Sequence, residues 1–115
     1  MTMNNLLTKL IGDRKEWKRM EARAHALPRD YRVVYGEMQS YLWRFTAGDG
    51  MDIVALLADV LAGFEAAAAQ GKQALEVTGE DVAGYCDARL GDATPYDRYL
   101  EKWRDSLNRD VKRKL

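Results

Sequence analysis

The sequence predicts an all-α fold, a compact bundle of about five helices around a central apolar helix at about Met51–Gln70. Three observations predict it. Apolar residues recur every three to four positions along the chain, as they do in amphipathic helices. No segment alternates apolar and polar residues in the manner of a half-buried strand. Nearly every residue of 51–70 is apolar or small, and a helix of that kind is buried on several sides.

Glu65 lies on the apolar side of this central helix. The other acidic groups, Asp52 and Asp59, share a narrow stripe on the opposite side. A carboxylate at the position of Glu65 is expected to pair with an Arg or Lys, to be protonated, or to lie at a subunit or ligand surface. The three carboxylates also exclude a membrane span, since each would cost roughly 2.5–3.5 kcal/mol at the bilayer centre.

Length and charge describe a single helical domain, residues 1–115, with a net charge of zero. The charge is uneven: residues 1–35 carry eight basic and four acidic groups, residues 36–95 three and ten, and residues 96–115 seven and four. We interpret this as basic terminal helices packed beside an acidic middle; a basic patch for nucleic acid is the alternative. Cys86 is the only cysteine, so no internal disulfide forms, which is consistent with a cytoplasmic protein.

The N-terminal third of the chain is expected to form two helices before the aromatic-rich one. A short amphipathic lead-in, 3–11, ends at Gly12, and a second helix begins with Asp13 as N-cap and runs to about Leu27. The third helix starts after Pro28 and runs to about Phe45. Its apolar stripe consists of Tyr31, Val34, Tyr35, Met38, Tyr41, Leu42 and Phe45.

Val33 and Trp43 lie off that stripe. A tryptophan on the polar side of an amphipathic helix is either an interface anchor or is covered by the N-terminal lead-in. We therefore include both residues, with Glu65, among the candidate interaction residues.

The remaining helices are predicted from their end signals. Asp49 is expected to cap the central helix and Gly71 to end it. Thr78 is the predicted N-cap of a fourth helix that runs from Gly79 to about Leu90, with Asp81 completing a capping box. Thr94 and the proline after it begin the last helix, whose stripe consists of Tyr96, Tyr99, Leu100, Trp103, Leu107 and Val111.

Few residues have the types and spacing that catalysis or metal binding requires. His25 is the only histidine, and Ala22 occupies the position where the Glu-x-x-His motif of a di-iron site has its glutamate. Cys86 lies on the core stripe of its helix, where thiols are inert. We therefore expect no catalytic residue, cofactor or metal.

Several short runs carry a family resemblance: Gly12-Asp13, Lys15-Glu16-Trp17, Ala22-Arg23-Ala24, Leu27-Pro28, Asp30-Tyr31-Arg32, Gly48-Asp49-Gly50, Gly71-Lys72, Leu75 to Val82 and Cys86-Asp87. From about Ile11 to Leu90 the chain resembles the bacterial "domain of unknown function 1048" family. The resemblance implies a small all-helical protein with no established activity and no assigned catalytic residues. Some members are labelled ferritin-like or starvation-type DNA-binding proteins. Members are often encoded beside PadR-type transcriptional regulators, which implies an accessory role.

The sequence thus leads us to a non-catalytic interaction protein, a homodimer and accessory partner of a PadR-type regulator. Two other classes stay open. One is a DNA-binding protein that uses the basic terminal helices, although the neutral net charge makes nucleic acid the less favoured partner. The other is a small-ligand binder built around Glu65.

Overall fold

The computed structural model describes residues 3–45, 51–90 and 98–115, and side chains within 14–44, 53–90 and 101–115. These residues form six α-helices and one 3₁₀ turn: α1 (Met3–His25), α2 (Arg29–Leu42), η1 (Trp43–Phe45), α3 (Met51–Ala69), α4 (Ala74–Thr78), α5 (Val82–Leu90) and α6 (Arg98–Lys114). Over those ranges the protein is all-helical, which confirms the predicted fold class. The predicted caps at Asp49 and Thr94 lie outside the described residues.

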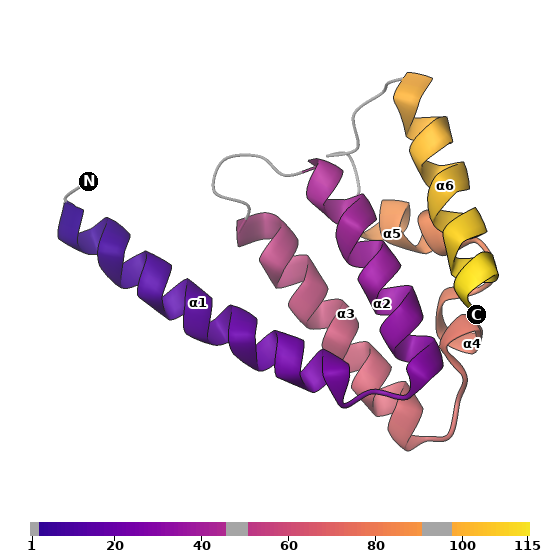
Figure 1. The fold of residues 1–115 in the computed structure, drawn as a ribbon, viewed down its shortest axis with the longest axis horizontal. Coiled ribbons are helices and arrows are strands. Elements are labelled where there is room, and N and C mark those ends of the chain that lie inside the picture. Colours follow the sequence, from indigo (N-terminus) through magenta and orange to yellow (C-terminus); the bar gives the residue numbers. More distant parts are fainter. Residues whose placement is uncertain (1–2, 46–50, 91–97) are drawn as a thin grey trace.

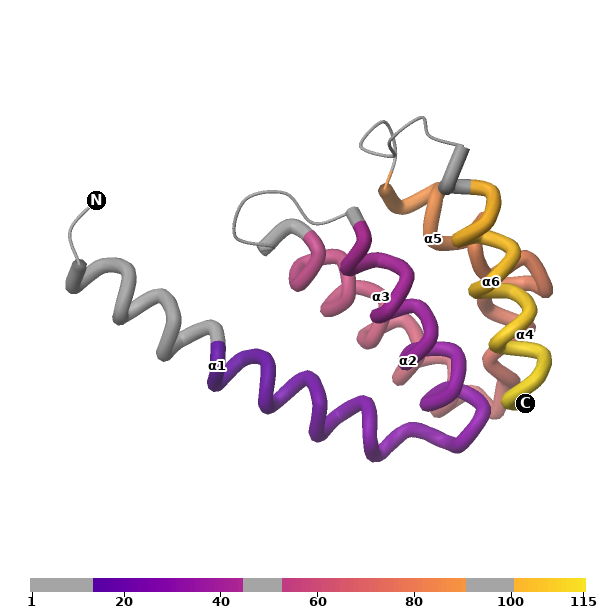
Figure 2. The backbone as a smooth tube through the Cα atoms, turned by 45° about the horizontal axis from the view of Figure 1, so that its top comes forward, coloured from indigo at the N-terminus to yellow at the C-terminus, as the bar shows by residue number. Residues whose placement is uncertain are grey.

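Helix α2 occupies the middle of the molecule. It contacts all five other α-helices, with α1 and α3 to one side and α4, α5 and α6 to the other (Figure 1; Figure 2). Six residues of the stripe predicted for it are confirmed as buried: Tyr31, Val34, Tyr35, Met38, Tyr41 and Leu42. The side chain of Phe45, the last residue of that stripe, lies outside the described ones. Covering both sides of one helix lets a short chain build a continuous core.

Helix α3 packs against α1, α2 and α4, and its Leu57, Leu61 and Phe64 side chains are completely buried. The Phe64 ring meets Tyr31 and Tyr35 of α2 edge to face, with ring centroids 5.3 and 6.5 Å apart. The alanines of α3 differ from the expectation of burial on several sides, because Ala55, Ala62, Ala66 and Ala69 are exposed. Alanine is apolar but removes little area from water, so alanines do not fix which face of a helix is buried.

Helix α1 is continuous from Met3 to His25, so the helix break predicted at Gly12 is wrong. Glycine inside a helix costs about 1 kcal/mol relative to alanine, a cost that a 23-residue helix tolerates. The predicted lead-in and second helix are therefore one element.

Helix α3 ends as predicted at Gly71, whose φ of 78° lies in the left-handed region. The amide of Gly71 bonds to the carbonyl of Ala68 (3.0 Å), and that of Lys72 bonds to the carbonyl of Ala67 (3.1 Å). This pair of bonds is a Schellman motif, which satisfies the last carbonyls of the helix.

The predicted Thr78 cap is wrong. Thr78 is the last residue of α4, and its hydroxyl donates to the carbonyl of Gly79. The N-cap of α5 is Asp81, whose Oδ1 accepts the amide of Gly84 at 3.0 Å. Asn108 of α6 donates to the same oxygen at 2.9 Å and accepts the amide of Ala83, so the start of α5 is fixed to α6.

Helix α6 lies along α2 and α5. Of its predicted stripe, Leu107 and Val111 are buried and Trp103 is half-buried, and the side chains of Tyr96, Tyr99 and Leu100 lie outside the described ones. Lys114 joins the C-terminal end of α6 to α2 by two contacts. Its carbonyl accepts the Arg29 guanidinium at 2.9 Å, and its ammonium pairs with Glu37.

Candidate functional site

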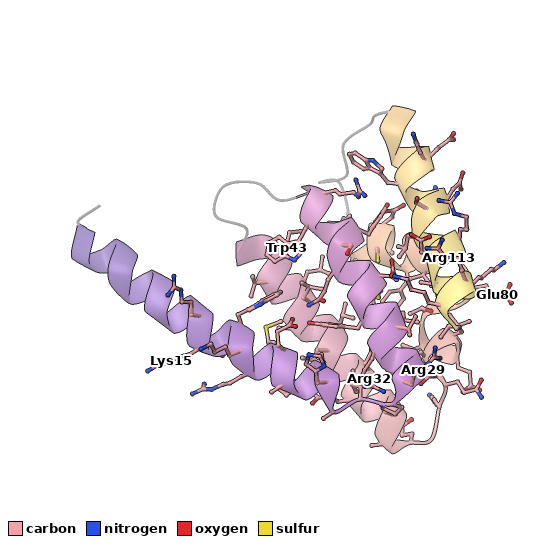
Figure 3. All side chains as sticks on the ribbon, viewed as in Figure 1. Lys15, Arg29, Arg32, Trp43, Glu80 and Arg113 are labelled. Carbon is pink, nitrogen blue, oxygen red and sulfur yellow. The ribbon has the colours of Figure 1, made fainter. Side chains whose placement is uncertain are left out.

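Trp17 of α1 and Trp43 of η1 form an aromatic surface, the name used below for this pair of side chains. The rings meet in a T-shaped arrangement with centroids 5.7 Å apart, the geometry that their quadrupoles favour. Trp43 is 37% exposed and is labelled in Figure 3. Trp17, which covers one side of the Trp43 ring, belongs to the predicted second helix and not to the predicted lead-in, whose side chains lie outside the described ones. A role for Trp43 as an interface anchor stays a prediction.

Glu65 pairs with Arg23 of α1. The Arg23 Nε donates to Oε2 at 3.2 Å, and Nη2 donates to Oε1. These hydrogen bonds lower the pKa of Glu65 and raise that of Arg23. The two side chains are 38% and 41% exposed. Of the predicted environments for Glu65, the structure therefore contains the paired one, and binding of a partner by Glu65 stays a prediction.

Val33 is half-buried on α2. Glu37 and Arg44 follow it at helical spacing, and both reach α6: Glu37 pairs with Lys114, and the Arg44 guanidinium lies 5.1 Å from the centre of the Trp103 ring. Val33 thus shares the side of α2 that faces α6, which accounts for an apolar residue off the main stripe. A role for it in binding a partner stays a prediction.

A polar network joins α2, α5 and α6. The Tyr41 hydroxyl donates to Asp87 Oδ1 at 2.6 Å, and Arg104 Nε lies 2.8 Å from Oδ2 of the same carboxylate. Burial and this hydrogen bond raise the pKa of Tyr41. Cys86 is buried beside the network, and burial raises the pKa of its thiol to about 12. The thiolate that a nucleophile needs therefore does not form near neutral pH.

A second group of polar residues, which the sequence analysis did not bring together, lines a cleft between α1 and α2. Its volume is about 120 Å³, and we call it the α1–α2 cleft; its lining residues are Glu21, Ala24, His25, Arg32, Tyr35, Gly36 and Gln39. The Gln39 amide donates to the Glu21 carboxylate at 2.8 Å. The Tyr35 hydroxyl is buried and has no well-formed hydrogen bond to a described residue, although the Gln39 side chain lies close enough to oppose the rise that burial causes in its pKa. The sequence signal that could have found this cleft is the spacing of Glu21 and His25 on one face of α1, opposite a glycine of α2.

A larger opening of about 540 Å³ lies where α2 begins and α3 ends. Most of its polar groups already have partners. The Tyr31 hydroxyl donates to the carbonyl of Lys72 at 2.6 Å, Asp30 accepts the amide of Ala74 at 2.8 Å, and Arg29 donates to α6. These bonds hold helix ends together and leave few groups free to orient a ligand.

The described ranges contain neither a cluster of metal-binding side chains nor a helix suited to crossing a membrane. No three His, Cys, Asp or Glu side chains within them gather where they could hold a metal ion. None of the helices traced there has the length and apolar character needed to cross a membrane.

Comparison with known proteins assigns the chain to a family. A family model described as "Protein of unknown function (DUF1048)" matches residues 8–112. The fold is similar to the crystal structure of a DUF1048 protein from Bacillus cereus, described as having a left-handed superhelix fold. The two share 46% sequence identity and a TM-score of 0.58, over 64% of this chain and 91% of the other. No curated protein matches. Because the family model covers nearly the whole sequence, this chain belongs to the DUF1048 family of proteins of unknown function.

Proposed function

We propose that this protein is a non-catalytic interaction protein that self-associates through the aromatic surface. The contact between Trp17 and Trp43 carries the proposal, because it presents two large rings at one place where α1 meets the end of α2. Tryptophan is enriched among the residues that dominate binding energy at protein interfaces. A ring that is 37% exposed still has apolar area to bury against a partner.

A second copy of the chain is the partner that the charge distribution favours. Net charge is zero, so two copies do not repel each other as wholes. Residues 1–35 are basic and residues 36–95 acidic. A two-fold interface uses the same patch of both copies, so that a residue i of one protomer contacts residue j of the other and j contacts i. Such an interface can set the basic α1 of one protomer against the acidic middle of its partner.

Light scattering on a size-exclusion column tests this proposal. We expect the mass of a dimer at tens of micromolar protein, and a monomer mass for Trp43→Ser. Leu115→Ser is the matched control, since Leu115 is also a large exposed apolar residue but lies at the far end of α6. It should leave the dimer intact. A wild-type monomer, or equal loss of mass in both variants, would contradict the proposal.

We further propose that this dimer acts in the cytoplasm, as a single helical domain, beside a PadR-type regulator. The family resemblance supports this partner. The test uses the purified regulator: wild-type protein should retain it on a column, and Trp43→Ser should retain less if the aromatic surface also serves this contact. Failure to retain the regulator would remove this partner and leave the self-association test unaffected.

A further inference from the structure

The aromatic surface is too small to hold a dimer by itself. Trp43 is 37% exposed, which leaves it less than about 100 Å² to bury, because a whole tryptophan buries about 150–250 Å². Stable interfaces bury about 800 Å² on each partner. Among the described side chains, the other large apolar residue that is exposed is Leu115, at the far end of α6. A dimer formed at the aromatic surface therefore needs a further contact.

Helix α1 is longer than the elements that lie against it. Gln39 of α2 bonds to Glu21 of α1. Trp43, four residues farther along, meets Trp17, which lies four residues back along α1. Because η1 ends two residues after Trp43, this register places its end opposite 14–16, whose side chains are exposed. About three turns at the start of α1 therefore extend beyond α2 and η1.

Helix α3 covers α1 closely only near the C-terminal ends of the two helices. They run in the same direction, lie closest at those ends and separate toward their N-terminal ends (Figure 1; Figure 2). Glu65, which pairs with Arg23, marks the side of α3 that faces α1. Leu61, Ala58 and Val54 precede it on that side at helical spacing. Leu61 is completely buried, whereas Ala58 and Val54 are half-buried, so apolar area on this side of α3 stays uncovered.

Residues 3–11 have the sequence pattern of a helix that docks through one face. Five of these nine residues are large, apolar and at helical spacing: Met3, Leu6, Leu7, Leu10 and Ile11. Trp17 continues the same side of the helix, seven residues after the last leucine. Lys9 is the one charged residue of the segment, whereas α3 contains three acids and no base. Because α1 is one continuous helix, the segment cannot fold back over its own Trp43.

We propose that residues 3–11 of each copy dock onto the other copy, at its aromatic surface and the adjoining uncovered side of α3. This inference rests on the proposed self-association and names the segment that completes the interface. Trp17 lies six residues before Arg23 on α1, and Ala58 lies seven before the partner of Arg23 on α3, so the two receiving areas lie at one level. The positive charge of the segment then approaches the acidic α3. The contact forms twice, because a two-fold axis makes it reciprocal.

Light scattering on a variant of the segment tests the inference. Leu6→Ser combined with Leu10→Ser should raise the dissociation constant of the dimer roughly a hundredfold or more, since each copy loses two apolar anchors. Asn5→Ser combined with Thr8→Ser is the matched control on the polar side of the same turns, and it should leave the dimer intact. A dimer that persists in the leucine variant would overturn this inference and leave the proposed self-association standing. A wild-type monomer would overturn both and leave the segment to a different partner.

Cross-linking tests the contact without relying on a weakened dimer. Leu10→Cys in one preparation is mixed with Ala58→Cys in another and oxidised, and we expect a disulfide-linked pair of the two variants. The native Cys86 is buried, so it does not compete. Lys112→Cys replaces Ala58→Cys in the control, because Lys112 is exposed at the far end of α6, and it should yield much less product. Equal yields with the two partners, or no product with Ala58→Cys, would overturn the inference.

Discussion

Arg23 and Glu65 join α1 to α3 by a two-pronged ion pair across 42 residues of sequence. Arginine matches a carboxylate in this way because its planar fork presents two parallel N–H groups. The pair lies where the exposed alanines of α3 leave little apolar area for α1 to cover. The ion pair therefore helps to hold α1 against α3, where apolar packing contributes little.

The first prediction concerns the Arg23–Glu65 pair. Glu65→Gln should lower the free energy of unfolding by about 1 kcal/mol, the range for an ion pair that water still reaches rather than a buried one. Asp59→Asn is the control, since Asp59 is an exposed acid on the same helix with no bonded partner among described residues. Urea denaturation gives both values. Equal values for the two variants would mean that the ion pair does not stabilise the fold.

The second prediction is that the contribution of Glu65 to the free energy of unfolding is lost in acid. The hydrogen bonds from Arg23 lower the pKa of Glu65 in the folded state. Its contribution is therefore complete above the unfolded pKa of about 4.3 and is lost as pH falls through the lower folded value. Wild type and Glu65→Gln should differ at neutral pH and converge below about pH 4. Urea midpoints measured across this range check it, and a constant difference down to the lowest pH would contradict it.

The third prediction concerns the start of α5. Asp81→Ala should cost about 1–2 kcal/mol, because the amide of Gly84 loses its acceptor. Asn108 of α6 also loses its hydrogen bond to the start of α5. Thr78→Ala is the matched control and should stay within about 0.5 kcal/mol. Thermal unfolding of both variants measures the two losses of stability. A larger loss for Thr78→Ala than for Asp81→Ala would favour Thr78 as the N-cap, as predicted from the sequence.

The fourth prediction compares two glycines: Gly63, which lies inside α3, and Gly71, which lies in the turn that follows it. Gly71→Ala should destabilise by roughly 1 kcal/mol, because its φ of 78° disfavours a side chain. Gly63→Ala should stabilise by up to about 1 kcal/mol, since its helix interior has room for a methyl group. Chemical denaturation measures both, and effects of the same sign would show that the turn is not formed as described.

The fifth prediction concerns nucleic acid. Because the net charge is zero and the basic groups of α1 and α6 are interspersed with acids, duplex DNA should bind weakly and lose affinity steeply with salt. Fluorescence anisotropy with labelled duplex measures this. A submicromolar complex at physiological salt would favour the DNA-binding alternative.

Local patterns predicted most of the helical elements, but they divided α1 in two and did not predict α4. The α2 stripe and the Gly71 end follow from spacing and from one residue type. Between Thr78 and Val82 the same signals support two schemes, because Thr78 and Asp81 are both good N-caps. Gly79, with a φ of 75°, decides between them by ending α4.

The candidate site was predictable only in part. The apolar surroundings of Glu65 indicated a need for a cation, but periodicity cannot select Arg23 from 42 residues away. For Tyr35 the pattern predicted burial correctly, yet it contains no information on whether the hydroxyl finds a partner. Such questions depend on how helices are placed in space, which no single-segment pattern describes.

The two contacts of Lys114 with α2 have a consequence for folding during synthesis. Arg29 and Lys114 are 85 residues apart, so the side of α2 that carries Val33 and Glu37 has no cover until α6 has been made. At roughly 5–20 residues per second, that delay is several seconds. Throughout it, α1, α2 and α3 can associate, whereas the other face of α2 stays open to the solvent. The nascent chain therefore presents to the cell a helical surface that the finished protein conceals.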